Sequence, residues 1–407
     1  MTKISTDILI LGAGIGGYET YRSLNRLLAW YGIKKNITIV NEHNYFTFAP
    51  LLHEVASGSV EPSHCTFSLT ELVYKTPHHF IRATVNKINA ERRTVETSAG
   101  TIAYTYCIMA LGSKVHFFNT PGAEKYAYTV RTLPKAMELR ENLIDCLETK
   151  PKKINLTVVG GGYSGVEVAG QMAYLREHTV EKLYPHTKLH IRIVEAAATV
   201  TPQLPLRAQR KITKRLKKLG VELLFNAKVA RLEKDYVCLA SGKSLPSDFS
   251  IWCTGIHNLA DCYMHERDCK KNRLPVTKFL NHEHYPEFYG VGDIILGYND
   301  GGDKPFPQLG EAAYKQGEYV ARHIVAQLRD KSIEPFHFSS FGMLMPIGER
   351  YGVAIMGKFV FSGLSAWWLR RMAYILFMPG FLRKINLMIE WTLRLFGFSY
   401  IIDLDRK

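Results

Sequence analysis

Two short glycine loops are the part of this sequence whose residue types and spacing could do chemistry. The first reads Gly-Ala-Gly-Ile-Gly-Gly over residues 12–17, and the second reads Gly-Gly-Gly-Tyr-Ser-Gly over residues 160–165. Each loop follows a short apolar stretch and precedes a segment of helical pattern. In that setting the glycines let the backbone approach a pyrophosphate, and the next helix presents oriented N–H groups to it. The glycines of the two predicted dinucleotide sites are Gly12, Gly14, Gly16 and Gly17, and Gly160, Gly162 and Gly165.

An acidic residue at the end of the second strand of such a fold usually holds the adenosine ribose. Beyond the second loop, the apolar run 191–194 ends at Glu195, whose carboxylate would bond the ribose 2′-OH and repel a 2′-phosphate. We therefore expect NADH rather than NADPH at this site. Beyond the first loop, the run 37–40 is followed by Asn41 and Glu42, and either side chain could take the role.

The repeated strand, loop and helix must position these residues, and the repetition predicts an α/β fold with two Rossmann-like dinucleotide-binding domains. Buried strands ending in glycine turns are also expected at 102–112 and 250–255. A further strand and turn are expected at 288–293, followed by a helix from about Leu309 to Leu328.

Length and composition limit the class of protein. The chain has 407 residues, enough for two or three domains. Its 52 Lys and Arg against 37 Asp and Glu leave a formal charge of +15, which suits nucleic acid, anionic lipid or merely a soluble surface. The 7 cysteines are scattered, without a Cys-x-x-Cys pair, so we predict no disulfide framework and no metal site.

The C-terminal region, 346–407, differs from the rest of the chain in the pattern of its apolar and charged residues. From Phe381 to Phe396 polar residues fall on one side of a helix and apolar residues on the other, and the segment 366–378 carries Arg370 and Arg371 among aromatic residues. The polar residues are Arg383, Asn386, Glu390 and Arg394.

This region is expected to lie on a membrane. Its longest charge-free run, from Met372 to Leu382, is well short of the roughly 20 residues that a spanning helix needs. We therefore expect segment 366–396 to rest on an anionic membrane surface, with its arginines at the headgroups. The alternative is a helix pair packed on the body of the protein or on a second subunit, and a homodimer is compatible with both interpretations.

Taken together, these residues resemble the type II NADH:quinone oxidoreductases, the single-subunit NADH dehydrogenases that do not pump protons. The resemblance runs nearly end to end. It includes the segments 44–52 and 54–58, Ala110-Leu-Gly-Ser113, and Tyr289-Gly-Val-Gly-Asp293.

The resemblance implies FAD and NADH as cofactors and a quinone, either ubiquinone or menaquinone, as acceptor. It places the enzyme on the cytoplasmic face of the cell membrane or the equivalent mitochondrial inner-membrane surface. The FAD-binding domain would comprise 1–115 and 276–345, the NADH-binding domain 116–275, and the membrane module 346–407. Pro50, Val85, Ala110, Gly112, Asp293 and Gly310 would join the first loop and Asn41 or Glu42 in holding FAD, and Gly255 would close the NADH site.

Glu167 has two interpretations. It lies in the first turns of the helix after the second loop, where the helix dipole alone favours a carboxylate. The resemblance instead implies a catalytic position beside the nicotinamide.

The expected quinone segment departs from the family. An Ala-Gln-x-Ala-x-Gln helix start is expected, but both amides are replaced by charges, Glu311 and Lys315. Spaced i, i+4 on one helix face, they are predicted to pair. They could also act on the acceptor, with Lys315 stabilising negative charge on its oxygen and Glu311 handling a proton. The departure leaves acceptor identity open.

Other flavoprotein functions fit less well. Sulfide:quinone oxidoreductases and disulfide reductases need redox-active thiols near the flavin, and the segment around Pro50 offers none. A flavoprotein with another acceptor, or a redox sensor that binds nucleic acid, stays an alternative that the net charge permits. No recognisable nucleic-acid module supports the latter, so nucleic acid is not expected as a partner.

Overall fold

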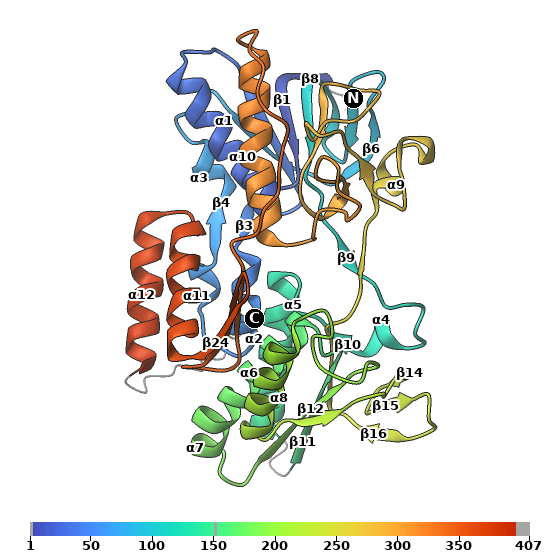
Figure 1. Ribbon diagram of the computed structural model, residues 1–407, viewed down its shortest axis with the longest axis vertical. Helices are drawn as coiled ribbons and strands as arrows, with labels where there is room; N and C mark the ends of the chain where they lie inside the picture. Colours follow the sequence, from blue (N-terminus) through green and yellow to red (C-terminus); the bar gives the residue numbers. More distant parts are fainter. Residues whose placement is uncertain (1–2, 150–152, 396–407) are drawn as a thin grey trace. The chain divides into compact units, whose positions relative to one another are not determined.

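The computed structural model describes residues 3–149 and 153–395, and its contacts divide the chain into two compact units (Figure 1). Unit 1 comprises Met1–Phe48, Thr66–Lys114 and Ile256–Ser340. Unit 2 comprises Ala49–Cys65, Val115–Gly255 and Phe341–Lys407. Each unit is built around its own sheet with parallel strands, so the predicted α/β class is confirmed.

The sheet of unit 1 has the order β5-β2-β1-β8-β7-β6, and β20 pairs with β8 as well. Its central parallel strands contain runs of apolar residues with both faces covered, as the fully buried residues 8–11 of β1 illustrate. Strands β6 and β7 are antiparallel additions at one edge. The strands are β1 (Lys3–Leu11), β2 (Ile37–Asn41), β5 (His79–Arg82), β6 (Val85–Asn89), β7 (Thr94–Thr97), β8 (Gly100–Met109) and β20 (Phe288–Gly290).

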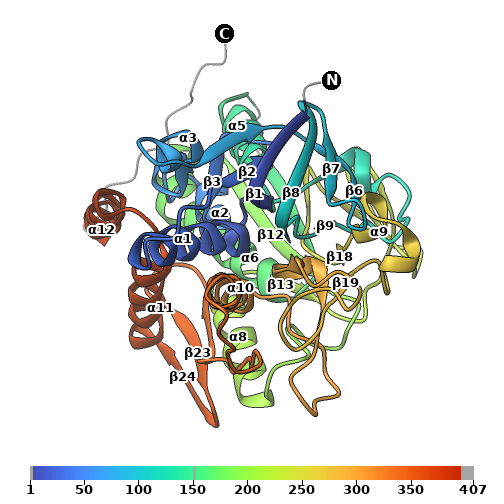
Figure 2. The same cartoon turned by 90° about the horizontal axis from the view of Figure 1, so that it is seen from above.

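Helices α1 (Ile15–Trp30) and α10 (Gly310–Gln327) lie side by side against this sheet (Figures 1 and 2). Glycine makes their close approach possible, because a Cβ on Gly317 would lie 2.5 Å from the carbonyl oxygen of Gly16. The predicted helix from about 309 to 328 is confirmed by α10. Smaller elements of unit 1 are β3 (Tyr45–Thr47), β4 (Thr66–Ser68), α3 (Leu69–Val73), α9 (Ala260–Tyr263), β19 (Leu274–Pro275) and β21 (Ile295–Leu296).

Unit 2 repeats the plan with the parallel sheet β10-β17-β11-β12-β13. Helices α5 (Leu133–Thr149), α6 (Tyr163–Leu175) and α8 (Leu206–Lys218) belong to this unit, together with the short helices α2 (Leu52–Ala56), α4 (Ala123–Tyr126) and α7 (Glu181–Leu183). The parallel strands are β10 (Ala127–Tyr128), β11 (Lys153–Val159), β12 (Lys188–Val194), β13 (Glu222–Leu224) and β17 (Phe249–Trp252). A separate antiparallel sheet is formed by β14 (Val229–Glu233), β15 (Tyr236–Leu239) and β16 (Ser244–Pro246).

The C-terminal part of unit 2 is a three-stranded antiparallel sheet followed by two helices. The predicted amphipathic helix is confirmed as far as Leu395, while Phe396 and residues 397–407 lie outside the described residues. Among the described helices, none combines the length and apolar content needed to cross a bilayer. The elements are β22 (Met343–Pro346), β23 (Gly352–Met356), β24 (Phe359–Gly363), α11 (Leu364–Phe377) and α12 (Phe381–Leu395).

Candidate functional site

The first glycine loop connects β1 to α1 in unit 1. Gly12 has φ +92, and a Cβ there would lie 2.5 Å from the carbonyl oxygen of Ala110, so only glycine fits. Gly14 is the N-cap of α1, and a Cβ added to it would meet no atom within 4 Å. The loop therefore packs tightly against the protein at Gly12 and is open at Gly14, where a pyrophosphate could approach the helix N-terminus.

Asn41, at the end of β2, is bonded to this loop. Its Oδ1 accepts a hydrogen bond of 2.9 Å from the N–H of Ala13, and its Nδ2 donates to the carbonyl oxygen of His43 at 2.8 Å. Glu42 is exposed, and its carbonyl oxygen accepts a hydrogen bond from Arg82. Of the two sequence candidates, Asn41 therefore lies against the glycine loop.

The second loop, between β11 and α6 in unit 2, has the same construction. Gly160 has φ +102, and a Cβ there would lie 2.8 Å from the Cβ of Thr254. Gly162 is the N-cap of α6 and, like Gly14, is open. Glu195 accepts hydrogen bonds from the N–H groups of Gly161, at 2.5 Å, and Ala197, at 2.7 Å.

Asn41 and Glu195 thus occupy equivalent positions in the two units. In each case a side-chain oxygen after the second strand accepts an N–H of the glycine loop. Such a bond fixes the loop and the polar side chain relative to each other, which suits residues that would contact one nucleotide. The glycine cradles and their polar partners fit two dinucleotides.

Asp293 belongs to a polar cluster in unit 1. Its Oδ2 accepts a hydrogen bond of 2.6 Å from Ser113, and its carbonyl oxygen accepts hydrogen bonds from Asn258, at 2.7 Å, and Gln308, at 3.0 Å. Gln316 accepts the N–H of Gly292 at 2.7 Å, which fixes the same turn. Asp293 is predicted from the sequence, whereas Asn258, Gln308 and Gln316 are not, because single amides far apart in the chain follow no periodic pattern.

The other predicted FAD residues are distributed over both units. Gly112 follows β8 with φ +65 and open space at its Cα. Val85 is the first residue of β6, Ala110 directly follows β8, and Gly310 is the first residue of α10. Pro50 belongs to unit 2, where its carbonyl oxygen accepts a hydrogen bond of 3.4 Å from Arg370.

Gly255 and Cys253 lie in the turn after β17 in unit 2. Gly255 has φ +76, and a Cβ there would lie 2.4 Å from the ring of Phe118, so a larger residue would not fit. Burial raises the pKa of the Cys253 thiol to about 12, and the nearby Glu167 adds to the rise. A thiol held protonated in this way is a poor nucleophile.

Glu311 and Lys315 form the predicted pair on α10. Their side chains are 2.9 Å apart, at 16% and 21% exposure. Each has a second partner in the irregular segment that follows the helix, since Lys315 donates to the carbonyl oxygen of Ser339 at 2.5 Å and Ser340 donates to Glu311 at 2.8 Å. The prediction of pairing is confirmed.

Glu167 lies partly buried in α6. Burial raises the pKa of its carboxyl from 4.5 to about 7, while Arg370 lowers it and Glu54 raises it. A carboxyl group with a pKa near neutrality can hold or release a proton under physiological conditions, as a general acid or base must.

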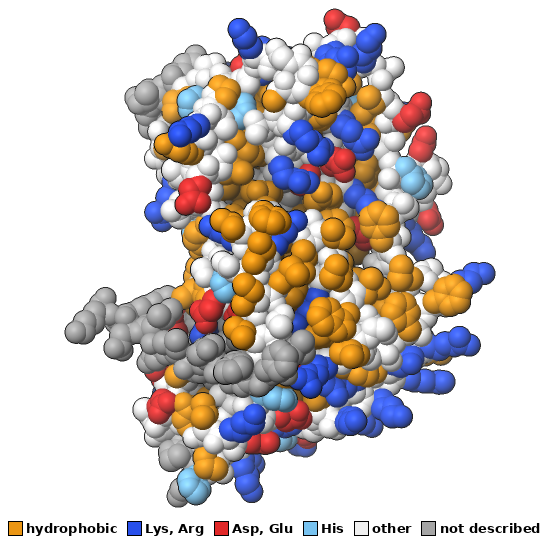
Figure 3. Space-filling model, turned by 90° about the vertical axis from the view of Figure 1, so that its left-hand side faces the viewer, with side chains coloured by type: hydrophobic (Ala, Val, Ile, Leu, Met, Phe, Trp, Pro, Cys, Tyr) orange, Lys and Arg blue, Asp and Glu red, His pale blue; other side chains and the backbone are white. Residues whose placement is uncertain are grey.

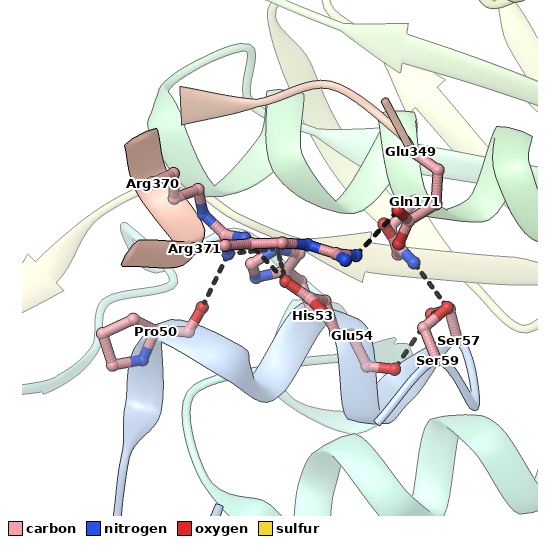
Figure 4. Close-up of polar contacts among 9 residues, drawn as sticks. All are labelled: Pro50, His53, Glu54, Ser57, Ser59, Gln171, Glu349, Arg370 and Arg371. Atoms are coloured by element: carbon pink, nitrogen blue, oxygen red, sulfur yellow. Dashed lines mark hydrogen bonds and ion pairs between the residues drawn. The ribbon is translucent and has the colours of Figure 1, made fainter. Parts of the chain in front are cut away.

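Arg370 lies at the centre of a buried polar network in unit 2 (Figure 4). It donates to Glu54 Oε1 at 2.8 Å, and the two side chains are 2% and 4% exposed. Burial on its own would raise the pKa of Glu54, but Arg370 and its neighbours hold that pKa below its usual value. Burial and Arg370 together lower the pKa of His53 to about 3, so His53 is neutral in this network.

Arg371 is buried beside it. It pairs with Glu349 at 2.9 Å and stacks on the rings of Trp367, at 3.6 Å, and Trp391, at 4.5 Å. The expectation that Arg370 and Arg371 reach anionic headgroups was therefore wrong. A helical pattern shows which residues share a face of the helix. It does not show that carboxylates from distant segments lie in the core, where they pair with these arginines.

The outer surface of α11 and α12 is apolar. The side of α12 that faces the protein carries the buried Leu387 and Trp391 together with the partly buried Glu390, which accepts from His64 at 2.5 Å. Figure 3 views this side of the molecule and shows hydrophobic side chains gathered over it. The exposed apolar residues of the two helices are Leu364, Trp368, Met372, Leu376, Phe377, Phe381, Leu382, Ile385, Met388, Ile389 and Leu393.

Two parallel sheets, each carrying a glycine loop and a polar residue bonded to it, define the class of oxidoreductases with two dinucleotide-binding folds. The chain belongs to the pyridine nucleotide-disulphide oxidoreductase family, whose model matches residues 6–317.

Comparison with individual proteins shows which members of this family the chain resembles. The chain is 25% identical to a probable NADH dehydrogenase of Dictyostelium discoideum, over 94% of this chain and 88% of that protein. It is also 25% identical to the type II NADH:quinone oxidoreductase Ndh of Mycobacterium tuberculosis, over 95% of this chain and 87% of that protein. The structure of NDH2 from Plasmodium falciparum in complex with NADH has a TM-score of 0.85 at 20% identity, covering 98% of this chain and 100% of that one. The resemblance to type II NADH:quinone oxidoreductases is confirmed at this level.

Arg370→Met should destabilise the protein strongly, because it leaves the Glu54 carboxylate buried without its partner. We expect a loss of about 3–5 kcal/mol in the free energy of unfolding, measured by denaturant titration. Arg370→Met combined with Glu54→Leu removes both charges and should recover most of this loss. Lys135→Met is the control, since its pair with Glu138 is exposed and should matter little. Equal losses in the single and double variants would contradict the assignment.

Glu167→Gln should change how stability depends on pH. Between pH 4.5 and about 7 the native protein retains a proton on Glu167 that the unfolded chain releases, so the stability of the wild type falls as pH rises through this window. The glutamine variant lacks this fall, so its stability relative to wild type should improve with rising pH. Urea unfolding across the window measures the difference, and Glu124→Gln, at an exposed position, is the control. Parallel curves for Glu167→Gln and wild type would refute the raised pKa.

Proposed function

We propose that this protein is an FAD-dependent NADH dehydrogenase that passes electrons to a membrane quinone without pumping protons. The observation that carries the proposal is the matched pair of glycine loops, each bonded to the polar residue that follows the second strand. The overall reaction converts NADH, a proton and quinone to NAD⁺ and quinol.

The residues divide between two cofactors. Gly12, Gly14, Gly16, Gly17 and Asn41 would hold the FAD pyrophosphate and ribose, with Asp293 toward the ribityl chain. For NADH the corresponding residues are Gly160, Gly162, Gly165 and Glu195, with Gly255 closing the site. FAD, when bound, supplies an isoalloxazine that accepts a hydride from NADH and gives two electrons to the acceptor. The FAD-binding domain would be 1–115 and 276–345, and the NADH-binding domain 116–275.

Glu195 supports NADH over NADPH. Both of its oxygens already accept backbone N–H groups, so the carboxylate is held in place beside the loop. A 2′-phosphate brought to that position would meet a fixed negative charge, whereas a ribose hydroxyl could donate to it.

Glu167 is the residue best suited to handle a proton. Its pKa near 7 lets it exist in both forms at neutral pH, and Arg370 provides a fixed positive charge that influences it. We assign it a catalytic position at the nicotinamide side of the reaction.

Glu311 and Lys315 are assigned to the acceptor. The ion pair holds the Lys315 side chain in one orientation, so its ammonium can stabilise negative charge that develops on a quinone oxygen. An unpaired carboxylate at this position would oppose negative charge on the quinone, and the pairing of Glu311 with Lys315 reduces this opposition. A quinone is favoured over a disulfide or sulfide partner because the cysteines of the chain are free, and those near the site, such as Cys253, have a raised pKa.

The C-terminal module 346–407 would bind the membrane peripherally. The exposed apolar residues of α11 and α12 form a surface that would enter the acyl boundary of a bilayer, where a lipophilic quinone is dissolved. We place the protein on the cytoplasmic face of the cell membrane or the equivalent mitochondrial inner-membrane surface.

The function is tested with the purified, FAD-loaded protein. NADH should bleach the flavin under anaerobic conditions, and added ubiquinone or menaquinone should restore its colour, with NADPH reacting much more slowly. A panel of quinones with sulfide as an alternative donor identifies the acceptor and donor. A colourless protein that takes up no flavin, or a flavin reduced by sulfide and not by NADH, would rule the proposal out.

Replacing the α10 pair tests its role. Glu311→Gln with Lys315→Gln should lower kcat/KM for quinone by roughly tenfold or more, because a positioned cation is lost where charge develops. NADH oxidation by ferricyanide, a soluble acceptor, should be unchanged. Glu318→Gln with Arg322→Gln is the matched control, as it removes two opposite charges at the same spacing on the same helix. Undiminished quinone reduction in the first double variant would make the pair purely structural.

A further inference from the structure

Helix α8 carries a dense stripe of positive charge. Every charged residue in its sequence, LRAQRKITKRLKK, is a cation. The helix buries Ala208, Gln209, Ile212 and Leu216 against unit 2. The exposed cations are Arg207, Arg210, Lys214, Lys217 and Lys218, and among the described residues none of these five forms an ion pair.

This stripe opposes the stability of its own helix. Arg207, Arg210, Lys214 and Lys218 follow one another at spacings of three or four residues, so like charges lie next to each other along one face. The helix dipole favours cations only in the last turn. Solubility alone is served by interspersed charges of both signs, and it does not require a row of charges of one sign. A row of this kind indicates an anionic partner.

The cationic helix is joined firmly to the C-terminal part of unit 2. Lys211 donates to Ser362 of β24 at 3.1 Å, and Arg215 donates to the carbonyl oxygen of Glu349 at 3.3 Å. The carboxylate of Glu349 in turn pairs with Arg371 of α11. The stripe and the exposed apolar helices are therefore parts of one packed assembly.

Exposed apolar side chains also lie next to α8. The hairpin β23–β24, against which α8 packs, exposes Met356 at 43% and Phe359 at 77%, and Leu364 follows at the start of α11 at 52%. Figure 3 shows Lys and Arg side chains gathered at the lower right border of the hydrophobic surface. An apolar surface bordered by cations matches the boundary between acyl chains and headgroups of an anionic bilayer.

We propose that α8 binds the phosphate headgroups of anionic lipids and supplies the electrostatic part of membrane attachment. The arginines of α11 cannot do this, because Arg370 and Arg371 are 2% and 1% exposed and are paired with Glu54 and Glu349. The apolar helices supply the insertion and α8 supplies the selectivity for negative charge. This inference rests on the proposed peripheral membrane association.

The test is vesicle co-sedimentation of the full-length holoenzyme. Vesicles of phosphatidylcholine alone are compared with vesicles that also contain phosphatidylglycerol, at low and high salt. The test variant replaces Arg207, Arg210, Lys214, Lys217 and Lys218 with glutamine. The matched control replaces Lys34, Lys87, Arg92, Lys304 and Lys331 with glutamine, which lowers net charge equally at exposed positions in unit 1.

The α8 variant should partition onto phosphatidylglycerol vesicles about tenfold more weakly or worse, and equally well onto phosphatidylcholine. The control variant should bind both as wild type does, and high salt should abolish the wild-type preference. Oxidation of NADH with ferricyanide should be unchanged in both variants, which shows that they fold and hold their cofactors.

Other outcomes overturn the proposal. Equal loss in both variants would mean that net charge, and not α8, attracts the membrane. Equal binding of wild type to both vesicles would reject the role of α8 while leaving membrane association intact, whereas binding to neither would reject the association itself. A DNA duplex that displaced wild type from anionic vesicles, but did not bind the α8 variant, would assign the stripe to nucleic acid.

Discussion

The hydrogen bond between a glycine loop and the polar residue after the neighbouring strand is the constraint on which both nucleotide sites depend. Gly12 and Gly160 turn the chain at positive φ directly after a buried strand, and Asn41 and Glu195 then accept an N–H of the loop. Because the two strands are adjacent in a parallel sheet, one short contact fixes the polar side chain proposed to hold the ribose relative to the loop proposed to hold the phosphates. The main chemical difference between the two glycine loops is then their polar partner, which is the amide of Asn41 in unit 1 and the carboxylate of Glu195 in unit 2.

Buried charge organises the rest of unit 2. Arg370 and Arg371 bring α11 against Glu54 and Glu349, which lie in segments far apart in the chain. Breaking such a pair by removing one partner costs far more than the pair contributes over an apolar replacement, because the remaining charge is left buried without a partner. Arg370 also acts on its neighbours: together with burial it lowers the pKa of His53, and it opposes the rise that burial causes in the pKa of Glu167. Structure and acid–base chemistry are thus coupled through one arginine.

In unit 2, exposed apolar side chains and exposed cations are concentrated on different helices. With the arginines of α11 turned inward, the outer surface of α11 and α12 is free to be apolar, and cations are concentrated on α8 instead. Glu349 links the two helices, because its carbonyl oxygen accepts a hydrogen bond from Arg215 of α8 and its carboxylate pairs with Arg371 of α11.

The sequence by itself determined the two Rossmann-like folds, with their glycine loops and the position of Glu195 at the end of a strand. It also determined the Glu311–Lys315 pair and the amphipathic pattern of α12. These features depend on φ angles, strand ends and helical spacing, all of which are set within a few residues. Only the tertiary structure decided that Asn41 and not Glu42 meets the first loop, that Asn258 and Gln308 support Asp293, and that Arg370 and Arg371 are buried. The physical reason is that each of these outcomes depends on a partner brought near by packing of distant segments, and no local spacing records such a partner.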